Sequence, residues 1–352
     1  MLCSVAATCG GCPLIATPYA SQLETKRQVV LASLSRHIEE ASSLPCRVIP
    51  APQQVGYRNR LRLDVRAGAP AFFNRGKSPA CVVLRSDLQT EMERFRALWS
   101  SGAALSGYTH AEVRSPDLDG RPGAFLGFEH GAPSPVPACW SDHFVVGSGS
   151  ADPKREAGDL PFQRFRVVDG VYQYVPVDGF MQVNSDVNAL LVQELVAGAV
   201  ARGLDSFADL YCGSGNFALP LLSAGLSGHG VERHPGSVRG ATRAAHEQGW
   251  AGRFDVADAP QWARAREAED SAYALLVVDA PRAGVKQDWS TFAALSSSHL
   301  AVCSCNPATL GRDVAQFAAC GFSLEEICIF DMFPQTRHVE TLVWLRKRTS
   351  RR

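Results

Sequence analysis

A cysteine in the stretch Ser-Cys-Asn-Pro-Ala-Thr-Leu, residues 304–310, is the first candidate for chemistry. The stretch follows a short apolar run that predicts a strand, and Pro307 and Thr309 favour the start of a helix directly after it. Cys305 would therefore lie between a strand end and a helix N-terminus, where the helix dipole favours thiolate over thiol. A nucleophile is one interpretation, and a small buried hydrophobic side chain is the other.

Acidic side chains are predicted at the ends of three further strands, which close with Asp209, Glu232 and Asp279. The apolar run 273–278 before the last of them is typical of a central parallel strand that is buried on both faces. Ligands of open α/β sheets bind beyond the carboxyl ends of the strands, so we expect these carboxylates and Cys305 to lie around one site.

A glycine-containing loop, Asp-Leu-Tyr-Cys-Gly-Ser-Gly at 209–215, predicts a nucleoside ligand. Its glycines let the backbone approach a ligand closely, and Glu232 is placed to accept hydrogen bonds from ribose hydroxyls. The Gly-x-Gly-x-x-Gly pattern of a pyrophosphate binder is incomplete because residue 218 is Ala. The pattern fits S-adenosylmethionine better than NAD, and Asp258 is expected on the adenine side.

Three cysteines occur within ten residues at the start of the chain, in the pattern Cys-x5-Cys-Gly-Gly-Cys (Cys3, Cys9 and Cys12). Converging thiolates suit zinc or an iron–sulfur cluster, both of which normally need four ligands. One Cys-x-x-Cys unit with an outlying cysteine favours iron–sulfur over zinc, and three unligated thiols are the alternative. The candidates for a fourth ligand are Cys46, Cys81 and Cys139.

The region from 46 to about 165 is rich in Pro and Gly, and its short apolar runs predict antiparallel strands and loops. Within it, Arg58, Arg60 and Arg62 recur at a spacing of two, which places them on one face of a strand. Five arginines and one lysine stand against one aspartate between 57 and 77. This basic face is suited to RNA phosphates, and the alternatives are a solvated face or pairing with acidic neighbours.

The whole chain has 352 residues, enough for two domains with cores, and equal numbers of basic and acidic residues, 35 each. Its overall charge therefore gives no argument for nucleic acid. We see no signal peptide and no apolar run of about 20 residues, so we expect no membrane span and a cytoplasmic protein. In that compartment eleven cysteines indicate free thiols or a metal site rather than disulfides.

Three further elements are expected. Residues 19–40 have the spacing of an amphipathic helix, and residues 187–200 that of an apolar helix with Asn184 or Ser185 as its N-cap. Residues 327–345 read as two apolar strands around a loop that contains Pro334, which is typical of a closing β-hairpin.

Taken together and in order, several stretches resemble the bacterial RNA (uracil-5)-methyltransferases over nearly the whole chain. They are Cys-x5-Cys-Gly-Gly-Cys at 3–12, Tyr19-x-x-Gln22-Leu23-x-x-Lys26, Tyr57-Arg58, Phe180-x-Gln182-Val183-Asn184, 209–217, 304–313 and 331–340. Two features depart from the family: Asp279-Ala280-Pro281-Arg282 stands where Asp-Pro-x-Arg is usual, and residues 85–165 match poorly.

The resemblance implies a class I S-adenosylmethionine-dependent, Rossmann-like α/β domain at 166–352. It follows a Cys-cluster segment with a helix at 1–45 and a β-rich RNA-contacting domain at 46–165. Because Cys3 is so close to the start, we expect no N-terminal RNA-binding β-barrel. A [4Fe–4S] cluster on Cys3, Cys9, Cys12 and Cys81 is implied, and it favours 23S rRNA over tRNA as the substrate of a monomeric enzyme without an obligate protein partner.

The resemblance also implies roles for single residues. Cys305 would attack C6 of uracil, Glu340 would remove the C5 proton, and Asp279 would orient the base. With the residues of the glycine-loop pattern, the candidates for binding the cofactor are Gln182, Asp209, Tyr211, Gly213, Gly215, Glu232, Asp258 and Asp279. The candidates for binding RNA are Phe180 and Gln182, which the resemblance implies, and Arg58, Arg60 and Arg62 of the basic strand face. Rival interpretations are a small-molecule or DNA methyltransferase and a non-catalytic RNA-binding protein.

Overall fold

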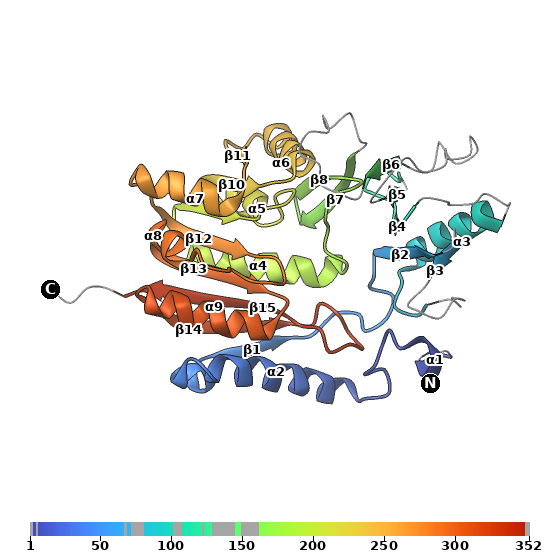
Figure 1. Cartoon of the computed structure of the whole chain (residues 1–352), viewed down its shortest axis with the longest axis horizontal. Coiled ribbons are helices and arrows are strands. Elements are labelled where there is room, and N and C mark those ends of the chain that lie inside the picture. Colours follow the sequence, from blue (N-terminus) through green and yellow to red (C-terminus); the bar gives the residue numbers. More distant parts are fainter. Residues whose placement is uncertain are drawn as a thin grey trace.

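The computed structural model describes residues 3–4, 6–66, 69–71, 81–100, 108–121, 123–128, 145–148 and 162–348. Its main body is an eight-stranded sheet with helices on both faces, and a five-stranded sheet lies to one side of it (Figure 1). Across these ranges no helix combines the length and the apolar character that a membrane crossing requires.

The large sheet has the order β1-β14-β15-β13-β12-β9-β10-β11, and only β15 runs against its neighbours. Its parallel strands therefore end at one edge, which faces the smaller sheet (Figure 1). The strands are β1 (Cys46–Ile49), β9 (Ser206–Leu210), β10 (Ser227–Glu232), β11 (Arg253–Val256), β12 (Tyr273–Asp279), β13 (Ser296–Ser304), β14 (Phe322–Phe330) and β15 (Glu340–Lys347).

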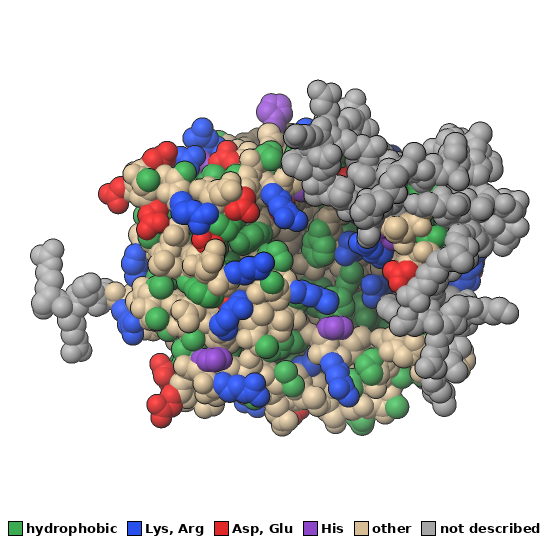
Figure 2. Space-filling model, viewed as in Figure 1, with side chains coloured by type: hydrophobic (Ala, Val, Ile, Leu, Met, Phe, Trp, Pro, Cys, Tyr) green, Lys and Arg blue, Asp and Glu red, His purple; other side chains and the backbone are tan. Residues whose placement is uncertain are grey.

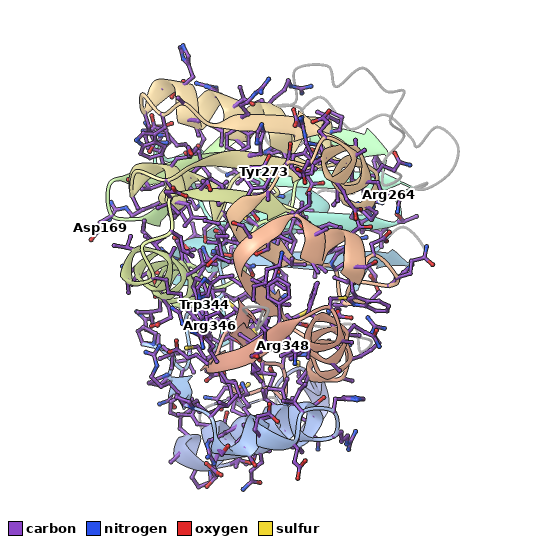
Figure 3. All side chains as sticks on the ribbon, turned by 90° about the vertical axis from the view of Figure 1, so that its left-hand side faces the viewer. Asp169, Arg264, Tyr273, Trp344, Arg346 and Arg348 are labelled. Atoms are coloured by element: carbon purple, nitrogen blue, oxygen red, sulfur yellow. The ribbon has the colours of Figure 1, made fainter. Side chains whose placement is uncertain are left out.

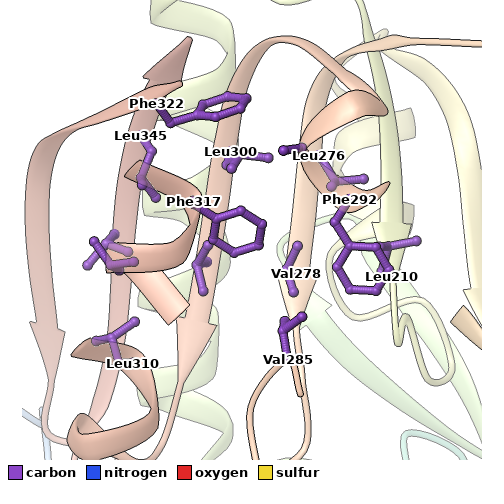
Figure 4. Packing of buried hydrophobic residues seen from close by; sticks show 14 of the residues in the cluster. Leu210, Leu276, Val278, Val285, Phe292, Leu300, Leu310, Phe317, Phe322 and Leu345 are labelled. Atoms are coloured by element: carbon purple, nitrogen blue, oxygen red, sulfur yellow. The ribbon is translucent and has the colours of Figure 1, made fainter. Parts of the chain in front are cut away.

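Helices on one face of this sheet enclose the first of two buried apolar clusters (Figure 4). Phe292 and Phe317 from two of these helices pack against Leu276 and Leu300 of the sheet. The helices of this face are α2 (Tyr19–Ser35), α7 (Ala259–Ala268), α8 (Trp289–Ala294) and α9 (Pro307–Ala319), together with the short η1 (Glu39–Ser43).

The opposite face is covered by three helices and a hairpin, which enclose the second cluster. They are α4 (Ser185–Ala201), α5 (Ala218–Ser223), α6 (Pro235–Glu247) and the hairpin of β7 (Phe162–Val168) and β8 (Val171–Pro176). Side chains of β12 alternate between the two clusters, with Leu276 and Val278 in the first and Leu275 and Val277 in the second. The prediction of a central strand buried on both faces is confirmed.

The smaller sheet has the order β3-β2-β4-β5-β6. Helix α3 (Ser86–Ser100) packs beside it, although we had expected only strands and loops here. Leu88, Met92 and Phe95 recur at helical spacing and are all buried, and this signal was missed in the sequence. The strands are β2 (Arg60–Arg66), β3 (Ala69–Ala71), β4 (His110–Arg114), β5 (Gly123–Phe128) and β6 (Val145–Ser148).

The N-terminal part of the chain joins the large sheet. After the short helix α1 (Ala6–Cys9), helix α2 ends at Ser35, five residues before the predicted end, and packs on α9. Strand β1 then pairs in parallel with β14, so residues 46–49 belong to the large sheet and not to the smaller one. Figure 3 shows the edge that faces away from the smaller sheet, where Tyr273 begins β12 and Arg346 lies near the end of β15.

Candidate active site at the carboxyl edge of the sheet

A cleft of about 870 Å³ opens beyond the carboxyl ends of the parallel strands, with Arg58 and Arg60 on its opposite wall. It brings together most of the residues that the sequence singled out. Those that line it are Cys305, Glu340, Asp279, Gln182, Phe180, Tyr211, Gly213, Glu232, Asp258, Arg58 and Arg60.

Three adjacent strands place the reactive groups. Cys305 directly follows β13, whose neighbours β12 and β15 bring Asp279 and Glu340 to its two sides. In the strand register Asp279 pairs with Cys303 and Ser304 pairs with Thr341. Continued by one residue, this register puts Glu340 opposite Cys305, with Asp279 two residue steps behind them at the same end of the sheet. The convergence follows from sheet order and register, which no local motif determines.

Cys305 has the predicted local setting, between a strand end and a helix start. The side chain of Asn306 caps α9 by accepting a hydrogen bond from the Ala308 amide at 3.1 Å. Burial nevertheless raises the pKa of the Cys305 thiol, and the nearby carboxylates of Glu340 and Asp279 raise it further. Burial and the two carboxylates therefore outweigh the expected preference for thiolate.

Arg282 is the group that opposes this shift. Its guanidinium attracts the Cys305 thiolate and hydrogen-bonds to it, which lowers the pKa of the thiol. The backbone carbonyl of Arg282 accepts hydrogen bonds from Asn306 Nδ2 at 3.2 Å and Thr309 Oγ1 at 3.4 Å, which tie its turn to α9. The unusual Asp-Ala-Pro-Arg order therefore still leaves both Asp279 and Arg282 on the cleft.

The two carboxyl groups are both hard to ionise. Burial and the charge of Asp279 raise the pKa of Glu340, while Arg282 lowers it. Burial raises the pKa of Asp279 to about 7. Two carboxyl groups at one dry site favour a state in which one of them holds a proton, so this pair is suited to moving a proton at neutral pH.

The glycine loop forms the other end of the cleft. The Gly213 amide donates a hydrogen bond to Glu232 Oε2 at 3.3 Å, and the His234 amide donates one to Oε1 at 2.8 Å. Tyr211 has φ 67°, a left-handed conformation that is strained for a residue with a side chain. Asp258 caps α7 through the Gln261 amide at 3.3 Å.

Three predicted residues do not line the cleft: Asp209, Gly215 and Arg62. Asp209 is fully buried; one of its oxygens accepts from the Ala218 amide at 3.0 Å, and the other has no partner. Gly215 has φ 91°, and an added Cβ would come within 2.7 Å of Leu219. Asp209 and Gly215 therefore support the conformation of the glycine loop from inside the protein. The Arg62 side chain is exposed outside the cleft.

Phe180 is 62% exposed at the cleft, and the guanidinium of Arg60 lies over its ring, 4.9 Å from the centroid. Arg60 also pairs with Glu112 at 3.3 Å, as the alternative of acidic partners anticipated. Arg114, which is buried, binds Glu112 at 2.8 Å and donates to the Pro176 carbonyl at 3.0 Å. The sequence reading missed Glu112 and Arg114, which tie the smaller sheet to the turn before Phe180.

The cysteines of the N-terminus gather on the far side of Arg58. Burial raises the pKa of Cys12 to about 11, and the thiols of Cys81, Cys9 and Cys3 raise it further, so these thiols are near enough to Cys12 to interact with it electrostatically. Among the described residues, the only possible metal ligands that gather in a group of three or more within 4.8 Å of one another are Glu194, Glu326 and Cys328, and the four cysteines do not form such a group. Arg58 lowers the pKa of both Cys12 and Cys81, which places it between this group and the cleft.

The other two candidates for a fourth ligand do not join the group. Cys46 lies in β1, where its electrostatic neighbours are Arg27 and Glu24, and Cys139 lies outside the described residues. The four remaining cysteines, Cys3, Cys9, Cys12 and Cys81, are partly buried, and four soft thiols are the donor set that an iron–sulfur cluster needs.

The sequence comparisons point to one family of RNA methyltransferases. A sequence model of the family described as tRNA (Uracil-5-)-methyltransferase matches residues 261–348. The 23S rRNA (uracil(1939)-C(5))-methyltransferase RlmD of Pseudomonas fluorescens is 31% identical over 97% of this chain and 79% of its own. An uncharacterised RNA methyltransferase of Thermosynechococcus vestitus is 30% identical over 97% of this chain and 83% of its own.

The fold also has a counterpart among solved structures. The tRNA (uracil-54, C5)-methyltransferase of Pyrococcus abyssi, solved with S-adenosyl-L-homocysteine, superposes with a TM-score of 0.71. The match covers 95% of this chain and 85% of the archaeal one at 22% identity, which supports the predicted α/β methyltransferase fold. With a sheet edge that unites cysteine, carboxylates and glycine loop, and with relatives that align along almost its full length, this chain belongs to the RNA (uracil-5)-methyltransferase family.

Proposed function

We propose that this protein methylates C5 of a uridine in RNA with S-adenosylmethionine as the methyl donor. The observation that carries the proposal is the convergence of Cys305, Asp279 and Glu340 from three adjacent strands on one cleft. The same cleft continues to Gly213 and Glu232, whose amide and carboxylate suit a nucleoside. These two sets of residues in one cleft support a uracil at Cys305 and a methyl donor at the glycine loop.

The first step uses Cys305 as a nucleophile. Its thiolate forms a bond to C6 of uracil, and the electron pair of the C5=C6 bond moves toward C5 and the neighbouring carbonyl. S-adenosylmethionine, when bound, supplies an electrophilic methyl group on a sulfonium sulfur. C5 takes this methyl group, and the electrons of the broken S–C bond remain on sulfur. Arg282 stabilises the thiolate that starts the step.

The second step uses Glu340 as a base. C5 now carries a methyl group and a proton, and the carboxylate of Glu340 accepts the proton. The electrons of the C–H bond restore C5=C6, and the Cys305 thiolate leaves. We assign Asp279 to orienting the uracil, because its raised pKa keeps it a hydrogen-bond donor for part of the time near neutral pH.

The RNA must present an unstacked uridine, because the reactive groups lie inside a cleft. Phe180 is exposed enough to stack on the base, and Arg58 and Arg60 offer cations to the backbone. Lys and Arg side chains are spread over the middle of the face in Figure 2, while acidic ones gather toward its left-hand side. We propose 23S rRNA as the substrate, as in the Pseudomonas relatives by name, with tRNA as the second candidate, and a cytoplasmic monomer.

Cys3, Cys9, Cys12 and Cys81 are proposed to hold a [4Fe–4S] cluster. The support is the electrostatic influence of the other three thiols on Cys12, the partial burial of all four, and the softness of four thiolates. Purification without oxygen should give bound iron and sulfide and a broad visible absorption, and Cys81→Ser should lose both. Cys46→Ser is the matched control and should keep the full iron content. Iron loss in both variants or in neither would contradict the ligand set.

The function is tested with Cys305→Ala on ribosomal RNA that lacks 5-methyluridine. The variant should bind S-adenosylmethionine but form neither 5-methyluridine nor a covalent RNA adduct, whereas the wild type forms both. Methylation by the variant at the wild-type rate would end the assignment. A wild type that methylates DNA or a small molecule instead of RNA would favour the rival enzyme classes.

A further inference from the structure

The loop between β14 and β15, residues 331–339, leads directly into Glu340 and contributes Phe333 to the cleft. A buried ion pair holds its first residue: Lys26 of α2 donates to Asp331, and the two side chains are 2% and 0% exposed. Tyr19 donates its hydroxyl to the other Asp331 oxygen at 2.8 Å, and Lys26 Nζ also donates to the Phe333 carbonyl at 3.1 Å. Side chains of helix α2 thus bind the first residues of the loop.

A reciprocal amide pair holds the middle of the loop. Gln22 Nε2 donates to the side-chain oxygen Oε1 of Gln335 at 2.9 Å, and the backbone N–H of Gln335 donates to Gln22 Oε1 at 3.1 Å. Both side chains are 1% exposed. The Leu14 amide donates to the Gln335 carbonyl at 3.0 Å, so the segment two residues after Cys12 belongs to the same contact. The proposed function uses none of these residues.

We expect these contacts to fix the position of the loop more than they stabilise the protein as a whole. Moving a charge pair out of water costs energy that the pair regains only in good geometry, so apolar packing would stabilise at least as well. What a buried pair with directional hydrogen bonds adds is a single allowed placement of the loop. The neighbouring Glu340 must reach the C5 proton of the substrate, and a displacement of about 1 Å in such a step costs on the order of 100-fold in rate.

We propose that Gln22 and Lys26 are positioning residues for proton abstraction by Glu340: helix α2 clamps the 331–339 loop and thereby sets the place of the base and of Phe333 in the cleft. The proposal rests on the proposed function of this site. It also assigns the N-terminal segment a mechanical role in catalysis, since that segment enters the clamp through Leu14.

The test compares two clamp variants with a matched control on the same helix. Lys26→Met/Asp331→Asn removes both charges at nearly constant volume and leaves no unpaired ion, and Gln22→Met removes the amide pair. Leu34 lies on α2 in the apolar core, and its side chain has no polar atom that could hydrogen-bond to the loop, so Leu34→Ala reports a general loss of stability. Each protein is examined in single turnover with labelled S-adenosylmethionine and RNA, per mole of folded, cofactor-binding enzyme.

Both clamp variants should transfer the methyl group to RNA within about twofold of the wild-type rate. They should then resolve the Cys305–RNA adduct at least tenfold more slowly, so the methylated adduct accumulates on denaturing gels. Leu34→Ala should lower the melting temperature without accumulation of the adduct. Resolution at the wild-type rate in both clamp variants, or equal slowing of methyl transfer and resolution, would overturn the positioning role. A wild type that forms no adduct and no 5-methyluridine would refute the proposed function instead.

Discussion

Arg282 gives the sharpest test of the electrostatics, because it opposes every other group around Cys305. The guanidinium lowers the pKa of both Cys305 and Glu340, whereas burial and the carboxylates raise both. Both groups act in their deprotonated forms, so the rate should rise with pH as each loses its proton. Arg282→Met removes the favourable charge and should move this acidic limb of the pH profile to higher pH.

The size of the shift follows from the setting of the arginine. The Arg282 side chain is exposed to water, which screens its charge, so we expect an effect on the rate of about tenfold and not the larger effect of a buried charge. A tenfold change in the deprotonated fraction corresponds to about 1.4 kcal/mol. The variant should therefore be about tenfold slower on the acidic limb and approach the wild type at high pH.

The assay is kcat/KM for RNA methylation across the neutral to alkaline range, with saturating S-adenosylmethionine. Arg282→Lys is the control: it keeps the positive charge, so the acidic limb of its pH–rate profile should lie close to that of the wild type. A loss of activity that is equal at every pH would refute the reasoning, because it would mean that Arg282 acts by holding RNA and not by stabilising the thiolate.

Other predictions concern the base and two buried charges. Glu340→Gln should accumulate the methylated adduct, seen as an RNA-linked protein by mass spectrometry, and wild-type turnover would exclude it as the base. Burial and nearby carboxylates raise the pKa of Asp209, so its contribution to stability is full below the ordinary Asp pKa and is lost as pH rises through the raised value. Asp209→Asn should flatten that dependence in urea unfolding and raise stability at alkaline pH; an unchanged pH dependence would contradict this. Lys26→Met alone strands the Asp331 charge and should cost about 3–5 kcal/mol in urea unfolding. Arg47→Met, at a half-exposed ion pair, should lower the free energy of unfolding by less than about 1 kcal/mol. Equal losses of stability in the Lys26 and Arg47 variants would contradict the role of burial.

Much of the catalytic half was predictable because its patterns are local. The strand before Cys305, the helix after it and the Asn184 cap of α4 all depend on neighbours a few residues away, and all are present. Asp279 and Glu232 end their strands as expected because the chain leaves the sheet where the apolar run stops.

Predictions failed or stayed open where a distant partner decides the outcome. Asp209 and Asp279 both follow apolar strand residues, yet the first points into the protein toward the Ala218 amide and the second onto the cleft. Strand β1 is too short to indicate its partner, and β14, its neighbour in the sheet, lies near the other end of the chain.

The sequence by itself determined the element types of the catalytic half, the glycine loop and the candidate nucleophile, since periodicity, capping and glycine placement act over one or two turns of chain. Only the tertiary structure decided which groups share the cleft. Sheet order brought Asp279, Cys305 and Glu340 together, and packing laid α2 beneath the loop that precedes Glu340. Lys26 and Asp331 are 305 residues apart, and the cost of burying either charge alone is what makes them meet.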